Sequence, residues 1–262
     1  MEFLYGLGFL LLFGLSALAG IALRARLPEE HLSKENMEAV RLVTGLLVTF
    51  AALVLSLQLS TARATFDTTA RNRSLYAAQL ARLDRCLRDM GPELAGSRET
   101  LRRYVAAVIA STWPLEPAPA VPGMPDVRGM AIRGEDAVLA GMMEAVGLAI
   151  DTGAPAPGRA AVSARCQADY VAVQGRRWAV IEDGNGPQGG VFVGIIGFWL
   201  ALVFLSFGLQ VPRRRLSGIV LGIGVISVAS VMFVIVDLAE PYRGLFGIRS
   251  VAMRQALADM TR

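Results

Sequence analysis

The chain contains a single histidine, His31, and two cysteines, and these shortages exclude several kinds of site. No Cys-x-x-Cys pair and no second histidine are present, so the usual spacing of zinc ligands is missing. His31 follows Glu29 and Glu30 in a polar stretch, which is typical of a solvated side chain. The sequence also has no G-x-x-x-x-G-K-[ST] phosphate loop and no G-x-S-x-G nucleophile motif. We therefore expect no enzyme, no catalytic residue, no metal and no cofactor.

Charged residues are also few. They make up 18% of the 262 residues, against about 25% in soluble domains, and the mean hydropathy is +0.48. Four apolar runs each come near or above the roughly 20 residues that cross a hydrocarbon core of about 30 Å. These runs are Phe3–Leu23, Leu42–Ala62, Val191–Pro212 and Leu216–Val236. The sequence therefore predicts a four-span membrane protein, with the lipid bilayer as its first partner.

Between the second and third runs, the apolar spacing is that of helices. Tyr76, Leu80, Leu83 and Leu87 form a stripe that predicts a helix continuing from the second span to Gly91-Pro92. Nearby arginines, Arg73 among them, fall off that stripe and are expected on a solvated face. Further helices are expected from Ser97 to Trp113, around Val138, Met142, Val146 and Ile150, and from about Gly158 to Asp183.

The fold class expected from these patterns is an all-α integral membrane protein. It has four transmembrane helices and a helical extramembrane domain inserted between the second and the third. A Pro-rich stretch from Pro114 to Pro125 is a loop, and no strand is expected. The expected divisions are 1–62 for the first two spans, 63–190 for the helical domain, 191–238 for the last two spans, and 239–262 for an interfacial motif with a terminal amphipathic helix.

One glycine-rich stretch, residues 184–189, formally satisfies the dinucleotide-binding pattern G-x-G-x-x-G. Such a loop needs a preceding strand and a following soluble helix. Here an apolar span follows and Pro187 lies inside the motif. We interpret it as a flexible linker into the third span.

Polar residues inside the spans gather on one face of the second run. Thr49, Ser56 and Ser60 share a helical face. They either line a path for ions or bond to their own and neighbouring helices, as hydroxyl side chains do inside membranes. The small-residue pairs Gly190/Gly194 and Gly218/Gly222 allow close helix approach.

The end of the fourth run carries two acids at the membrane boundary, Asp237 and Glu240. A carboxylate there is costly without a partner or water, and Arg243 and Arg249 are the expected partners. The alternative is an ordinary span end, stopped by Pro241. Ser250 is expected to cap the final helix, with Met253, Leu257 and Met260 on one side. The candidate residues of this motif are Asp237, Glu240, Pro241, Arg243, Gly244 and Ser250.

Both cysteines, Cys86 and Cys166, fall in the central region. They allow one disulfide in an oxidising compartment, or they are two small buried thiols. The sequence leaves both interpretations open.

The distribution of basic residues predicts the orientation. The formal net charge is +4, but the arginines lie beside the spans rather than in a nucleic-acid patch, so no nucleic acid is expected. The loop with Arg24, Arg26 and Lys34 and the loop Pro212–Arg215 lie on one side of a four-span model. The positive-inside rule places those loops in the cytoplasm, and the termini and central domain in the periplasm. Arg63, Arg71 and Arg73 argue for the reverse by count.

Two segments carry a resemblance to a known family. Phe198–Pro212 is similar to a Trp-x-x-x-x-Phe-x-Ser-Phe-Gly-x-x-x-Pro span, and Asp237–Ser250 to an acidic-Pro-aromatic-x-Gly-x-x-x-Ile-x-Ser ending. The chain thus resembles the bacterial bestrophin-like family of membrane proteins, whose function is not known. The resemblance implies a multi-pass protein of the bacterial inner (cytoplasmic) membrane and kinship to bestrophins, which are oligomeric anion channels.

That kinship also implies a helical domain and termini in the cytosol, opposite to the charge-based orientation. The aromatic neck of bestrophins is missing from the second span, where Thr44–Leu59 contains one aromatic, Phe50. Two functions follow as hypotheses. In one, a homo-oligomer conducts a small inorganic anion past Thr49, Ser56 and Ser60, with Arg63, Arg71 and Arg73 at one mouth. In the other, the protein is a membrane-anchored scaffold or sensor whose helical domain binds a protein partner.

Overall fold

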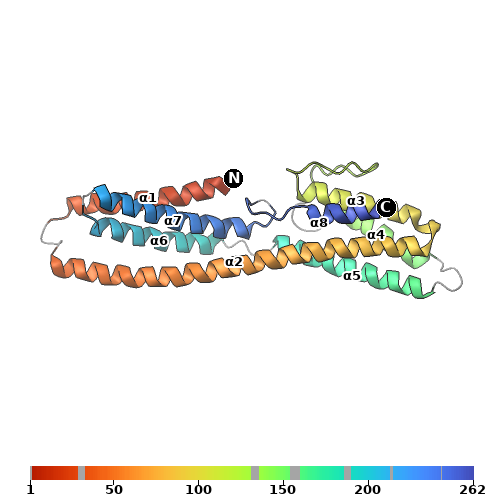
Figure 1. The fold of residues 1–262 in the computed structure, drawn as a ribbon, viewed down its shortest axis with the longest axis horizontal. Coiled ribbons are helices and arrows are strands. Elements are labelled where there is room, and N and C mark those ends of the chain that lie inside the picture. Colours follow the sequence, from red (N-terminus) through yellow and green to blue (C-terminus); the bar gives the residue numbers. More distant parts are fainter. Residues whose placement is uncertain are drawn as a thin grey trace. The chain divides into compact units, whose positions relative to one another are not determined.

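The computed structural model describes residues 2–28, 33–130, 136–153, 160–185, 190–212, 215–242 and 244–262. Across these residues the regular structure is helical, without a strand. The helices, shown in Figure 1, are α1 (Glu2–Arg26), α2 (Lys34–Met90), α3 (Ala95–Thr112), α4 (Ala137–Thr152), α5 (Ala160–Asn185), α6 (Gly190–Gln210), α7 (Arg215–Ala239) and α8 (Val251–Met260), with a 3₁₀ turn η2 (Pro92–Leu94). His31 and Arg213 lie outside the described residues.

Helices α1, α2, α6 and α7 are long and apolar enough to cross a membrane, so each of the four predicted spans lies in a candidate membrane-spanning helix. The chain divides into two compact units. The span unit comprises Met1–Phe66 and Gln188–Gly247, and the helical unit comprises Asp67–Pro187 and Ile248–Arg262. Helix α2 contributes to both, and its 57 unbroken residues confirm that the second span continues as a helix beyond the length of a bilayer crossing.

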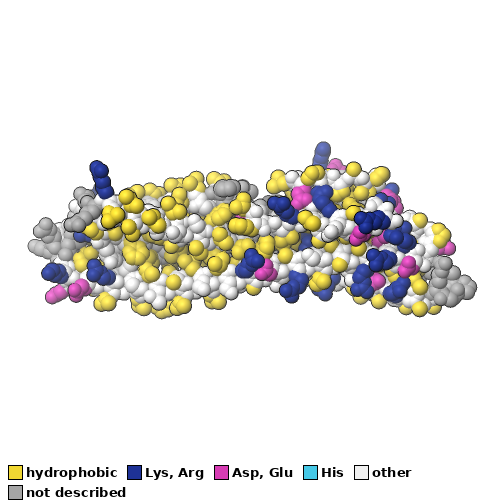
Figure 2. Space-filling model, in the orientation of Figure 1, with side chains coloured by type: hydrophobic (Ala, Val, Ile, Leu, Met, Phe, Trp, Pro, Cys, Tyr) yellow, Lys and Arg dark blue, Asp and Glu magenta, His cyan; other side chains and the backbone are white. Residues whose placement is uncertain are grey.

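The core of the span unit lies where α1, α6 and α7 pack together (Figure 1). The rings of Phe13 and Phe204 stack with centroids 5.3 Å apart, and Met232 is fully buried beside them. Ala51, Val54 and Leu55 of α2 are partly buried against this core. Many large apolar side chains of the unit face outward, and Figure 2 shows apolar side chains gathered over α1, α6 and α7. Such a surface suits acyl chains rather than water.

Helices α1 and α6 approach each other closely at Gly20 and Gly208. A Cβ atom on Gly20 would lie 2.2 Å from the Leu205 carbonyl oxygen, and one on Gly208 would lie 2.2 Å from the Ala17 carbonyl oxygen. By contrast, a Cβ on Gly190, Gly194, Gly218 or Gly222 would meet nothing within 4 Å. Within one chain, therefore, these four glycines are not used for a close approach of helices.

In the helical unit the predicted stripe is buried. Tyr76 is 1% exposed, and Leu80, Leu83 and Leu87 are fully buried. Helix α2 ends at Met90, and Gly91 follows with a positive φ of 126°, which suits glycine. Arg73 is only 5% exposed, so its expected place on a solvated face is wrong. It lies three residues before Tyr76, on nearly the same side of the helix.

Other helix ends differ from expectation in detail. Helix α3 begins at Ala95, two residues before Ser97, and its N-cap, Leu94, makes no side-chain cap. In α4 the side chain of Asp136 accepts from two backbone N–H groups, and the buried methionine is Met143 rather than Met142. Helix α5 extends through Gly184 and Asn185, so the predicted linker begins as helix, and residues 186–189 lie outside the described ranges.

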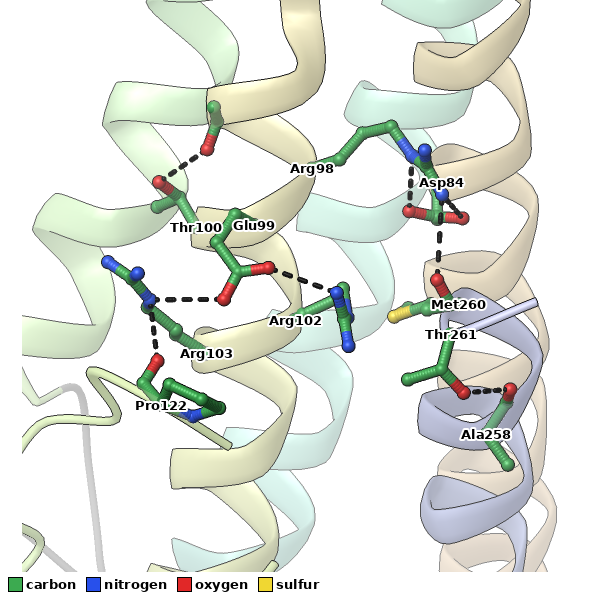
Figure 3. Close-up of polar contacts among 11 residues, drawn as sticks. Asp84, Arg98, Glu99, Thr100, Arg102, Arg103, Pro122, Ala258, Met260 and Thr261 are labelled. Carbon is green, nitrogen blue, oxygen red and sulfur yellow. Dashed lines mark hydrogen bonds and ion pairs between the residues drawn. The ribbon is translucent and has the colours of Figure 1, made fainter. Parts of the chain in front are cut away.

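Charged side chains link the helices of the helical unit. The buried carboxylate of Asp84 on α2 receives Nε and Nη2 of Arg98 on α3 at 2.9 and 3.1 Å. Arg98 also reaches the Met260 carbonyl at the end of α8, as Figure 3 shows. Arg103 bonds to the Pro122 carbonyl at 2.9 Å and so holds the Pro-rich loop against α3.

Candidate functional site

The polar face predicted on the second span is open in the single chain. Thr49, Ser56 and Ser60 are all exposed on α2. The Thr49 hydroxyl donates to the Gly45 carbonyl at 3.0 Å, so it is satisfied by its own helix. A different polar pair joins helices inside the span unit: the Gln210 amide donates to the buried Thr44 hydroxyl at 2.8 Å.

Asp237, the first acid of the terminal motif, is 2% exposed, as expected for a side chain that points inward. Its carboxylate accepts the backbone N–H of Leu245 at 2.7 Å and that of Phe246 at 3.0 Å. The expected partner was an arginine or a hydrated vestibule, and the structure gives two backbone amides instead. The charge is stabilised by charge-assisted hydrogen bonds, which also close a turn over residues 237–246.

The turn has no room for a side chain at either of its two glycines. A Cβ on Gly244 would lie 2.7 Å from Asp237 Oδ2, and one on Gly247 would lie 2.8 Å from the Gly244 carbonyl oxygen. Glu240 contributes its backbone carbonyl, which accepts the Gly244 N–H at 3.1 Å, and Pro241 follows in the turn. Arg243 lies outside the described residues. We name residues 237–247 the capped turn.

Ser250 stands at the N-cap of α8, but its side chain does not cap the helix. The cap is provided by Glu116 of the Pro-rich loop, which accepts the Ser250 N–H at 3.2 Å and the Ser250 hydroxyl. Arg254 donates to Glu116 at 3.3 Å, and the Trp113 indole donates to the Ile248 carbonyl at 2.6 Å. The hydrogen bond from Ser250, followed by those from its N–H and from Arg254, holds the pKa of Glu116 below its ordinary value.

The helical unit contains a buried polar cluster that the sequence pattern does not predict. The Tyr76 and Tyr104 hydroxyls are hydrogen-bonded to each other, and Arg177, 6% exposed, bonds to Tyr104. Burial raises the pKa of Tyr104, so this hydroxyl stays protonated at neutral pH. The Arg73 guanidinium lies 5.1 Å from the centre of the Trp113 ring. Arg73 is thus part of a buried network and does not line an open mouth in the single chain.

The two cysteines form a disulfide, Cys86–Cys166, which joins α2 to α5. Both are almost fully buried, at 3% and 0% exposed. The covalent link fixes two helices of the helical unit to each other.

No group of three or more histidine, cysteine, aspartate or glutamate side chains gathers in a metal-binding arrangement within the described ranges. The four long apolar helices define a helical membrane protein with four candidate spans. A family model, the Bestrophin-like domain, matches residues 11–253, and the chain belongs to this bestrophin-like family. A comparison with curated proteins and one with solved structures found no match.

Proposed function

We propose that this protein is a subunit of an oligomeric ion channel in the bacterial inner membrane and that it conducts a small anion. The observation that carries the proposal is membership of the bestrophin-like family, whose model contains three of the four candidate spans in full and most of the first. The proposal keeps the predicted divisions at 1–62, 63–190, 191–238 and 239–262, with the helical domain inserted between the second and third spans.

The exposed polar face of α2 supports this proposal. Thr49, Ser56 and Ser60 are exposed in the single chain, although they lie in a helix whose apolar stretch is long enough to span a bilayer. Hydroxyl groups that face lipid find no polar partner there. Around an oligomer axis, by contrast, they replace part of the hydration shell of an ion. Arg63 and Arg71 are exposed further along the same helix and raise the local anion concentration.

The test combines particle symmetry with ion flux. In lipid nanodiscs we expect a symmetric oligomer with an axial path, and in liposomes a chloride flux that Ser56→Ala and Ser60→Ala change several-fold. Ser227→Ala is the matched control, because Ser227 is also exposed but lies on α7, where its hydroxyl donates to the Ile223 carbonyl at 2.9 Å. A monomeric particle without flux would contradict the proposal.

The second candidate function is a membrane-anchored scaffold or sensor whose helical domain binds a protein. It is favoured by an apolar strip on α5, where Val171 is 68% and Trp178 53% exposed, with the exposed Gly175 between them. Exposed large side chains at one helical spacing suit a partner surface. A monomeric, non-conducting particle that loses a partner on Trp178→Ala would favour this function over the channel.

A further inference from the structure

The capped turn after α7 combines three features that a loop in water does not need. It folds back on the end of a candidate span, it provides acceptors for the four N–H groups of residues 244 to 247, and it exposes two large apolar side chains. None of these features depends on ion conduction.

The depth of the turn follows from α7. Asp237 lies 22 residues after Arg215, the first residue of that helix, so the two are about 33 Å apart along the axis. A hydrocarbon core is about 30 Å thick, so with Arg215 among the headgroups of one leaflet, Asp237 reaches the boundary of the other. The backbone nitrogens of Leu245 and Phe246 lie within hydrogen-bond distance of the Asp237 carboxylate and therefore share its depth.

Four consecutive backbone N–H groups of the turn have hydrogen-bond acceptors within the turn itself. The N–H groups of residues 244 to 247 all have acceptors: the Glu240 carbonyl, the two Asp237 carboxylate oxygens and the Gly244 carbonyl. A loop in water leaves such groups to the solvent, whereas a non-helical segment next to hydrocarbon must pair every one of them. This requirement explains why a buried carboxylate takes the place of water.

The side chains on the satisfied backbone are apolar. Leu245 is 63% and Phe246 53% exposed, and they are consecutive. In sequence they stand between Arg243 and Arg249, a flanking pattern of basic residues that suits phosphate headgroups.

We infer that the capped turn is an interfacial anchor, in which Leu245 and Phe246 insert into the acyl chains just below the headgroups of the leaflet that α7 reaches at Asp237. The occupant of this surface is lipid. Burying two such side chains away from water fixes the level of the end of α7 in the membrane.

The test measures depth with nitroxide spin labels on Leu245→Cys and Phe246→Cys. The full chain is placed in vesicles of phosphatidylethanolamine and phosphatidylglycerol, and accessibility to molecular oxygen is compared with accessibility to a water-soluble nickel chelate. Ile223→Cys, on α7 and 60% exposed, is the lipid reference, and Leu115→Cys, in the Pro-rich loop and 96% exposed, is the water reference. We expect oxygen-to-nickel ratios for positions 245 and 246 several-fold above that of the Leu115 label.

Two results overturn the inference. Ratios equal to that of the Leu115 label place the turn in water, and low accessibility to both reagents places it under protein, as in a contact between subunits. A second variant tests the cap: Asp237→Asn in the Phe246→Cys background should lower the ratio, because a neutral amide holds the two N–H groups less well. The same change at the exposed Asp259 should leave the ratio as it is.

Discussion

At the scale of single residues, the structure gives the two acids of the terminal motif different roles. Asp237 holds two backbone amides with a side chain that is 2% exposed, whereas Glu240 contributes its backbone carbonyl to the turn. The sequence marks both as costly carboxylates at a membrane boundary. The sequence does not show which of the two carboxylates is buried. The partners of Asp237 are backbone N–H groups eight and nine residues later, and no side-chain pattern indicates them.

This difference predicts the effect of removing each carboxylate. Asp237→Ala should destabilise the protein by about 1.5–3 kcal/mol, since a charged acceptor is lost from two N–H groups. Glu240→Ala should stay close to the control, Asp259→Ala, whose carboxylate pairs only with exposed Arg262 at 3.8 Å in the described part of the chain. Thermal unfolding in detergent measures the stability of all three variants. If Glu240→Ala lowers the stability as much as Asp237→Ala does, the backbone carbonyl is not the main contribution of Glu240.

A second prediction at this scale concerns acid pH and Glu116. Its pKa is lower in the folded protein than its ordinary value of 4.5, so its ionised form stabilises the fold above pH 4.5, and this contribution is lost as the pH falls through the lowered pKa. The Trp113 indole bonds to the neighbouring Ile248 carbonyl, so its fluorescence reports on release of α8. We expect the acid-dependent part of the thermal unfolding between pH 5 and 3 to be smaller in Glu116→Gln than in the parent.

At the scale of helices, the sequence predicts those elements whose apolar spacing is long and regular. The four candidate spans follow from long apolar runs, and the continuation of α2 with its buried stripe from Tyr76 to Leu87 follows from periodicity. What it does not predict are contacts set by a single atom or a distant partner. Gly20 and Gly208 lie 188 positions apart, and neither has a second glycine four residues before or after it.

The stripe on α2 carries the first prediction for helices. Leu83 is fully buried in the helical unit, and truncation of such a leucine costs about 2–5 kcal/mol. Leu83→Ala should therefore lower the unfolding temperature clearly, while Leu75→Ala, at a position that is 41% exposed, should change it little. An unchanged melting profile for Leu83→Ala would mean that the stripe is not a core.

The second prediction for helices concerns the contact between Gly20 of α1 and Gly208 of α6. Gly20→Ala places a methyl group 2.2 Å from the Leu205 carbonyl oxygen, so α1 and α6 must move apart and lose the packing of Phe13 on Phe204. Gly218→Ala meets nothing within 4 Å and gains helix propensity, so it should be neutral or slightly stabilising in the single chain. Unfolding in detergent measures the stability of both variants. A loss of stability in Gly218→Ala comparable with that in Gly20→Ala would point to a contact of Gly218 with another chain.

At the scale of the whole molecule, the open question is which side of the membrane holds the helical unit. Short basic loops resist translocation, so the loops Arg24–Lys34 and Pro212–Arg215 predict that residues 63–190 lie in the periplasm. The Cys86–Cys166 disulfide supports the same side, since disulfides persist in oxidising compartments. Bestrophins keep their helical domain in the cytosol, so membership of the family argues the other way.

The native cysteines are too buried to report the orientation, because a reagent reaches neither sulfur readily even after reduction. New cysteines at exposed positions avoid this difficulty. Leu115→Cys lies in the helical unit and is 96% exposed, and Pro212→Cys is exposed beside the basic loop. With a membrane-impermeant maleimide on intact spheroplasts, we expect Leu115→Cys to react at once and Pro212→Cys only after lysis. The reverse pattern would place the disulfide in the cytoplasm, where it would be reduced, and would make the bestrophin arrangement the correct one.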